Sequence, residues 1–314
     1  MNPETILSLD IGGTKILGVL INRDYEILTR QLFASPKGNQ AVRDSVFGVI
    51  DSLLNSARGL GLQPAGISID APGFVDTLNG CMIDAENLQV RNLSLTMPIE
   101  EHFHLPTRLF HDVRSATLGE ALFGAGQGCR HFIFLNIGTG VSVGLFLDGK
   151  IYNGAAGKTG EIGHFGHRPV GAGNPCGIEE RLEMLVSGPA LVRRAAMSGP
   201  EQGSLIFQLA GQDPNRITTQ IIQEAAVRKD DLAVRLIEET ADYLGLAIGG
   251  MLDLLNSECI ILGGGMAQMG ALLIEPLQRS VARYAIESVP LIAGKLGIEA
   301  GVTGAAAYYF GQGG

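Results

Sequence analysis

Leu9-Asp10-Ile11-Gly12-Gly13-Thr14-Lys15 is a glycine–threonine loop that follows an apolar run, which predicts a strand over residues 6–10. A second such loop, Asn136-Ile137-Gly138-Thr139-Gly140, follows an apolar run at 132–135, and Gly263-Gly264-Gly265 follows a third at 259–262. Glycine lets backbone N–H groups approach phosphate oxygens closely, because it has no Cβ and tolerates positive φ. Two such loops in equivalent halves predict one polyphosphate held from both sides, as in a nucleotide bound in a cleft.

The order of predicted elements also repeats. Three strands (6–10, 16–21 and 27–32) precede a helix (39–60) and a strand (65–69), and three strands (132–136, 141–147 and 150–152) open the second half. Predicted elements then follow at 178–196, 201–210, 215–228 and 230–256 (helices), 259–262 (strand), 268–285 (helix), 289–293 (strand) and 301–310 (helix). This order predicts a duplicated α/β fold of two lobes with an interdomain cleft. We expect lobes at 1–120 and 121–299, with the helix at about 300–314 packing back on the first.

Composition excludes several classes of protein. Apolar residues make up 46% of the chain and charged residues 18%, which excludes a disordered chain. The formal net charge is −9 and no Lys/Arg run occurs, so no nucleic-acid or membrane partner is expected. The four cysteines have no paired short spacing, and neither a signal segment nor an apolar run of about 18 residues is present. These features predict a cytoplasmic protein with free thiols.

Five motifs in order resemble the ROK family of bacterial sugar kinases and repressors. In chain order they are residues 9–15, Leu109-Phe110-His111-Asp112, residues 136–140, Gly160-Glu161-Ile162-Gly163-His164 and residues 260–265. The resemblance covers residues 5 to about 310 and implies an actin-like ATPase (ribonuclease H-like) fold, ATP with Mg²⁺, and commonly a homodimer. Repressor members carry a helix-turn-helix domain before the first phosphate strand. Only five residues precede Ile6 here, so DNA binding is not expected by this route.

The glycine loops are the predicted ATP site. The residues expected there are Gly12, Gly13, Thr14, Lys15, Gly138, Thr139, Gly140, Gly263, Gly264 and Gly265. The alternative is that these glycines only make tight hairpins. Asp10 ends the first strand beside the first loop, where a carboxylate can hold Mg²⁺ through water or cap a turn. We expect the magnesium role.

Asp112 is the predicted general base, because the resemblance implies that the Asp at this position takes the proton from the attacking sugar hydroxyl. The alternative is an N-cap for a helix that begins near Ser115. The family usually has Asn before this Asp, whereas this chain has His111. We expect His111 to hydrogen-bond a hydroxyl, with a different reach and a titratable charge, which leaves the sugar open.

Sugar contacts are further implied for residues in both halves: Gly73, Asn87, Glu161, His164 and Glu183. Gly73 is equally consistent with an ordinary turn, and Glu183 alone with a solvated helix face. The family's zinc motif contains three cysteines, of which only Cys176 is present, and His164 would be its second ligand. Because structural zinc takes about four ligands, we predict that zinc is absent.

The sequence therefore predicts an ATP-dependent kinase for a hexose or N-acetylhexosamine. Glucose, allose, mannose, fructose and N-acetylmannosamine are the candidate substrates. The alternatives are a sugar- or nucleotide-binding sensor that has lost catalysis, and a repressor fragment.

Overall fold

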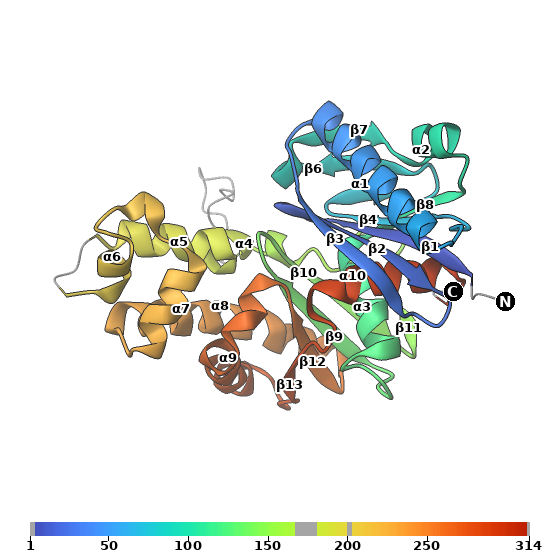
Figure 1. Cartoon of the computed structure of the whole chain (residues 1–314). Helices are drawn as coiled ribbons and strands as arrows, with labels where there is room; N and C mark the ends of the chain where they lie inside the picture. The colour runs from blue at the N-terminus through green and yellow to red at the C-terminus, as the bar shows by residue number, and fades with distance from the viewer. Residues whose placement is uncertain (1–3, 167–180, 200–202, 313–314) are drawn as a thin grey trace, which may run out of the picture. The chain divides into compact units, whose positions relative to one another are not determined.

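The chain forms two compact units in the computed structural model (Figure 1), which describes residues 4–166, 181–199 and 203–312. One unit comprises residues 1–128, 149–158 and 295–314, and the other comprises residues 129–148 and 159–294. The boundary expected at residues 120–121 stays a prediction. Each unit is described by itself below.

The first unit contains a mixed five-stranded sheet with strand order β3-β2-β1-β4-β8. The strands are β1 (Thr5–Ile11), β2 (Lys15–Asn22), β3 (Ile27–Ala34), β4 (Ile67–Ala71) and β8 (Thr107–His111). Strand β1 is antiparallel to β2 and parallel to β4, which in turn is parallel to β8. The carboxyl ends of β1, β4 and β8 therefore lie at one edge of the sheet.

Helices cover both faces of this sheet, because both faces carry apolar side chains. Leu7 and Leu9 of β1 pack with Val46 and Ile50 of α1 (Asn39–Gly59) on one face. On the other face, Ile6 packs with Val302 and Ala306 of α10 (Ala300–Tyr309).

Helices α10 and α3 (Asp112–Phe123) pack side by side. A Cβ atom at Gly304 would lie 1.6 Å from the Ser115 carbonyl oxygen, so their close approach requires glycine there.

A small antiparallel sheet of β5 (Phe74–Asp76), β6 (Cys81–Ala85) and β7 (Val90–Ser94), followed by α2 (Thr96–Phe103), is inserted between β4 and β8. The sequence analysis missed these strands, since three to five residues are too few to display a period. It also placed β4 at 65–69, two residues too early. The short run 86–88 forms a 3₁₀ helix.

The second five-stranded sheet has the corresponding order, β11-β10-β9-β12-β13. Its strands are β9 (Phe132–Ile137), β10 (Val141–Leu147), β11 (Lys150–Ile151), β12 (Cys259–Gly263) and β13 (Leu291–Ala293). Again β9 is antiparallel to β10 and parallel to β12, which is parallel to β13. The predicted α/β duplication is confirmed.

The helices of the second unit are α4 (Glu183–Val186), α5 (Gly188–Met197), α6 (Leu205–Leu209), α7 (Thr219–Val227), α8 (Asp231–Leu255) and α9 (Ala271–Tyr284). The single helix predicted over 178–196 is wrong, because Ser187 caps α5 at Ala190 N and Pro189 stands in its first turn. Residues 178–180 and 201–202 of two predicted helices lie outside the described residues.

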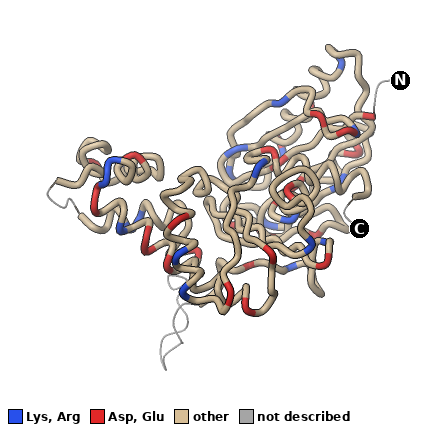
Figure 2. The backbone as a smooth tube through the Cα atoms, turned by 90° about the horizontal axis from the view of Figure 1, so that it is seen from below, with Lys and Arg blue, Asp and Glu red and all other residues tan. Residues whose placement is uncertain are grey.

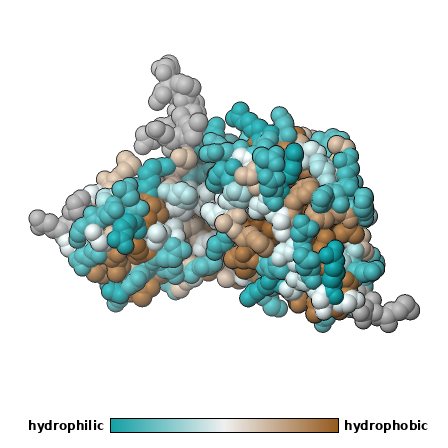
Figure 3. All heavy atoms as spheres, turned by 45° about the horizontal axis from the view of Figure 1, so that its top comes forward, coloured by the Kyte–Doolittle hydropathy of each residue, from teal (hydrophilic) through white to brown (hydrophobic). Residues whose placement is uncertain are grey.

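The surface carries charges of both signs. In Figure 2 Lys and Arg are interspersed with Asp and Glu along the chain, and on the face drawn in Figure 3 hydrophilic and apolar residues are intermixed. Among the described residues, no helix combines the length and the apolar character that crossing a membrane requires.

Candidate functional site

The first glycine loop connects β1 to β2 and is fixed by hydrogen bonds to its backbone. Gly12 N donates to Lys15 O (2.9 Å), and Ser35 Oγ donates to Gly12 O (2.7 Å). Lys37 Nζ donates to Gly13 O (2.8 Å) and also to Asn87 O, so this side chain ties the loop to the 86–88 turn. Thr14 and Lys15 are exposed at the end of the loop. The loop is thus ordered by its neighbours and leaves Thr14 and Lys15 accessible to a ligand.

The second and third glycine loops come together within the second unit. A Cβ at Gly138 would lie 3.9 Å from Gly265 N, and Gly188 N donates to Gly138 O (2.9 Å). Gly264 has φ +81°, and a Cβ there would lie 2.4 Å from Ile137 O. Only glycine fits this close approach, so the loops after β9 and β12 form one backbone-lined surface.

Two carboxyl groups meet at the strand ends of the first unit. Asp10 of β1 lies in register with Asp70 of β4. The Asp70 side chain is fully buried, and neither of its oxygens accepts a hydrogen bond from a donor among the described residues. Burial raises the pKa of Asp10, and burial together with the charges of Asp10 and Asp112 raises the pKa of Asp70 well above its usual range.

Asp70 was missed by the sequence analysis. The sequence does contain a sign of this pair. The same pattern, apolar–Ser–apolar–Asp, occurs at the ends of two strands, at Leu7-Ser8-Leu9-Asp10 and at Ile67-Ser68-Ile69-Asp70.

Asp112 is the first residue of α3, which directly follows the last parallel strand, β8. Its Oδ1 accepts a hydrogen bond from Val113 N (2.7 Å) and lies 3.2 Å from His111 Nδ1. The side chain is 26% exposed, so solvent or a ligand can reach it. The helix begins here and not at Ser115, so the predicted N-cap alternative is wrong: His111 occupies the cap position.

His111 is buried at the end of β8. Burial, with a smaller effect of the Arg114 charge, lowers the pKa of His111 to about 3. The imidazole is therefore neutral at physiological pH, and our expectation of a titratable charge near neutrality is corrected. His111 also lines a cavity of about 590 Å³ with Phe110, Arg114 and Tyr308, whose lining includes neither Asp10 nor Asp112.

The other predicted sugar-contacting residues of the first unit lie on the inserted sheet. Gly73 has φ +78°, and a Cβ there would lie 2.1 Å from Asp84 O, so the hairpin itself requires glycine. Asn87 is exposed in the 86–88 turn.

In the second unit, Glu183 is half-buried at the start of α4, and its Oε2 accepts a hydrogen bond from Val141 N (2.9 Å). Glu183 is therefore not on a solvated helix face, and its partner Val141 is the residue that directly follows the second glycine loop. Glu161 occupies the position before the 162–164 turn without a side-chain cap hydrogen bond, and His164 is exposed. A Cβ at Gly163 would lie 3.2 Å from Glu183 Oε2, so this turn lies beside Glu183.

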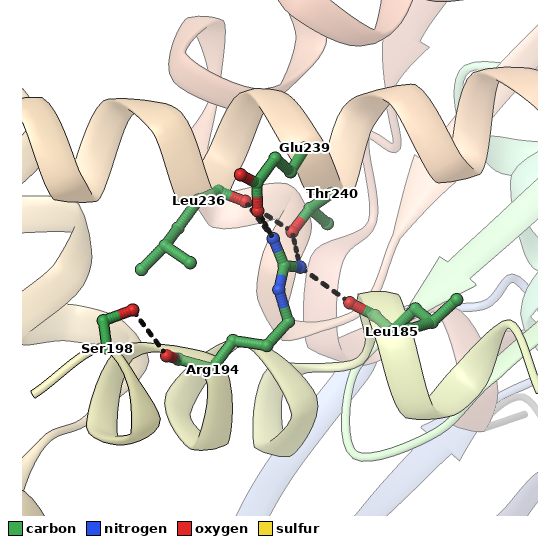
Figure 4. A network of polar contacts seen from close by, with 6 residues as sticks. All are labelled: Leu185, Arg194, Ser198, Leu236, Glu239 and Thr240. Atoms are coloured by element: carbon green, nitrogen blue, oxygen red, sulfur yellow. Dashed lines mark hydrogen bonds and ion pairs between the residues drawn. The ribbon is translucent and has the colours of Figure 1, made fainter. Parts of the chain in front are cut away.

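Arg194 holds α4 in place (Figure 4). From α5 its guanidinium donates to Leu185 O of α4 (2.8 Å) and to the Glu239 carboxylate of α8 (2.6 Å). It also donates to Thr240 Oγ1 and Leu236 O. The sequence analysis missed this residue, whose role depends on helices that are distant in the chain.

Metal-binding groups are sparse. Among the described residues no group of three or more His, Cys, Asp or Glu could hold a metal ion. Cys176 lies outside the described residues, so the predicted absence of zinc stays a prediction. The adjacent carboxyl groups of Asp10 and Asp70 nevertheless provide the oxygen donors that Mg²⁺ prefers, and Mg²⁺ is commonly held by only one or two carboxylates.

Two mixed sheets with glycine loops at their strand ends define an α/β protein of the ROK fold. The ROK family model matches residues 6–311, and the chain belongs to this family. A glucokinase of Streptomyces coelicolor is 30% identical over 308 residues, 96% of each chain. The structure of a ROK family glucokinase from Streptomyces griseus in complex with glucose and AMPPNP matches with a TM-score of 0.85 and 29% identity, covering 97% of this chain and 98% of that one. The DNA-binding transcriptional dual regulator NagC of Escherichia coli is 28% identical over 274 residues, 86% of this chain and 65% of its own.

Proposed function

We propose that this chain is an ATP-dependent sugar kinase that phosphorylates a hydroxyl of a hexose or N-acetylhexosamine. Glucose heads the candidate sugars, because the relatives at 30% identity are glucokinases and one similar structure holds glucose with an ATP analogue. Allose, mannose, fructose and N-acetylmannosamine remain candidates, since His111 departs from the usual Asn. The observation that carries the proposal is Asp112, a partly exposed carboxylate at the start of α3 beside the strand ends.

In the proposed reaction, Asp112 accepts the proton of the attacking sugar hydroxyl. The sugar oxygen forms a bond to the γ-phosphorus as the bond to the β-phosphate bridging oxygen breaks, and ADP leaves. The Val113 N–H and the neutral His111 side chain orient the Asp112 carboxylate. A positioned general base contributes about 10²–10⁴-fold in rate.

The glycine loops are proposed to bind ATP through their backbone amides. These are residues Gly12, Gly13, Thr14 and Lys15 of the first unit and Gly138, Thr139, Gly140, Gly263, Gly264 and Gly265 of the second. Asp10 is the proposed magnesium residue; when bound, Mg²⁺ neutralises charge on the phosphate oxygens. Gly73, Asn87, His111, Asp112, Glu161, His164 and Glu183 are proposed to contact the sugar.

A catalytically silent sensor of the same family is the second candidate. The similarity to NagC favours it, because that relative is a transcriptional regulator. A sensor would bind sugar without consuming ATP, so turnover separates the two.

The test is ADP release from Mg-ATP over a panel of hexoses and N-acetylhexosamines. We expect sugar-dependent turnover that falls about 10²–10⁴-fold in Asp112→Asn, with sugar binding retained. Asp51→Asn, an exposed residue of α1, is the matched control and should turn over like the parent chain. Sugar binding without turnover in the parent chain would reject the kinase and leave the sensor.

A further inference from the structure

The end of β4 carries an acidic group that the proposed reaction does not use. Asp10 and Asp70 are paired in the parallel ladder, so both side chains project from the same face of the sheet. Ser8 lies on this face too, and its Oγ donates to Val302 O of α10 (2.7 Å). The two carboxyl groups therefore lie on the face that α10 covers, with Asp70 fully buried and Asp10 partly exposed.

The first turn of α10 approaches both groups closely at Gly301, where only glycine fits. A Cβ at Gly301 would lie 2.9 Å from Asp70 Oδ2 and 3.2 Å from Asp10 Oδ2, so both oxygens converge on one point. The helix N-terminus supplies roughly half a positive charge, which offsets only part of two carboxylates. Among the described residues, the buried carboxyl group of Asp70 therefore has only the carboxyl group of Asp10 as a hydrogen-bonding partner, and the charge of the pair is only partly compensated.

Two carboxylates that face each other in a buried place repel, so a shared proton or a cation has to compensate the pair. The corresponding position in the second unit has no acid, because Gly263 lies opposite Asn136 there. The acid pair is therefore particular to the first sheet, and a cation held by two facing carboxylates would be bound there and not at the corresponding place in the second.

We propose that Asp70 is the second carboxylate of the divalent-cation site to which Asp10 belongs, so that the cation accompanying ATP is held between β1 and β4. The inference rests on the proposed function for the identity of the cation as Mg²⁺. Asp10 is the accessible ligand, and Asp70 is the buried one.

The test is binding of Mn²⁺, which favours the same oxygen ligands, to the full chain with ADP and no sugar. Free Mn²⁺ is measured by electron paramagnetic resonance. We expect Asp70→Asn to weaken Mn²⁺ binding at least 10-fold, since loss of even an outer-shell partner of a metal ligand costs about 10–100-fold in affinity. Ser68→Ala, on the same strand and equally buried, is the control and should bind like the parent chain. Equal affinity in Asp70→Asn and the parent, or no binding by the parent, would overturn the inference.

A crystal of the parent chain with Mn²⁺ and ADP tests it without any substitution. An anomalous peak within about 2.0–2.2 Å of an Asp70 oxygen supports the inference, and a peak that only Asp10 reaches overturns it. The proposed kinase activity and the proposed cation site can be rejected independently of each other. Mn²⁺ held by Asp70 without sugar-dependent ADP release rejects the kinase alone, and turnover with unchanged Mn²⁺ affinity in Asp70→Asn rejects the cation site alone.

Discussion

Asp10 lies opposite Asp70 across β1 and β4, whereas at the corresponding place in the other sheet Asn136 lies opposite Gly263 across β9 and β12. The strand order, the strand directions and the glycine loops correspond in the two sheets. Their inserts differ, because the first unit carries a small sheet between β4 and β8 and the second carries helices before β12. Both units thus present glycine loops, and only the first adds a pair of acids at its strand ends.

A side chain at Gly264, where the glycine loops of the second unit meet, should have the largest effect on stability and ATP binding. In Gly264→Ala the new Cβ meets the Ile137 carbonyl oxygen at a positive φ, so we expect a loss of about 2–5 kcal/mol in unfolding free energy. ATP binding should weaken at least tenfold. Gly250→Ala, at an exposed position of α8, is the control, because nothing lies within 4 Å of its Cβ position and it belongs to none of the glycine loops. Denaturant unfolding and ATP titration measure both effects, and equal behaviour of the two variants would contradict the prediction.

The helical insert of the second unit should depend on Arg194. Arg194→Met removes several charge-assisted hydrogen bonds between α4, α5 and α8, which should cost about 2–3 kcal/mol of unfolding free energy. Arg193→Met, an exposed neighbour with one such bond, should cost less than about 1 kcal/mol. Urea unfolding curves compare the two variants. A similar loss in both would show that Arg194 does not specifically hold α4.

His111 should account for part of the loss of unfolding free energy at acid pH. Its pKa of about 3 in the folded chain lies below its usual 6.5, so the unfolded chain binds more protons between these values. Stability is therefore present above pH 6.5 and is lost as the pH falls toward 3, by about 2 kcal/mol between pH 7 and pH 5. Urea unfolding of His111→Asn should show a shallower dependence over this range. An unchanged slope would place the sensitivity elsewhere.

Replacing Asp70 by a neutral residue should remove the acid pair, which the second sheet lacks. In the absence of divalent cations, Asp70→Asn should raise the unfolding free energy by about 1–2 kcal/mol at pH 7, because a neutral amide replaces a fully buried acid that faces the acid Asp10. The new amide can also donate to Asp10. Thermal unfolding in a chelator measures the gain. A loss of stability in this variant would mean that the carboxyl group of Asp70 itself stabilises the fold.

Long periodic segments and loop composition were predictable, because they rest on local physics. The strands before Gly12, Gly138 and Gly263 and the helix at residues 231–255 appear where apolar runs and helical spacing place them. Short strands such as β5 were missed, since their residues become strands only by pairing with β6. Ser187 and Pro189 divide a predicted helix through a local cap that apolar periodicity does not register.

The sequence alone determined the duplicated α/β pattern, the glycine loops and the family, because apolar periodicity and glycine spacing are properties of neighbouring residues. Tertiary structure decided the rest. It placed Asp70 against Asp10, although 60 positions separate them in the numbering, because parallel strands align their carboxyl ends. It also made His111 neutral and gave Glu183 a partner in Val141, since burial and long-range hydrogen bonds exist only once the chain has folded.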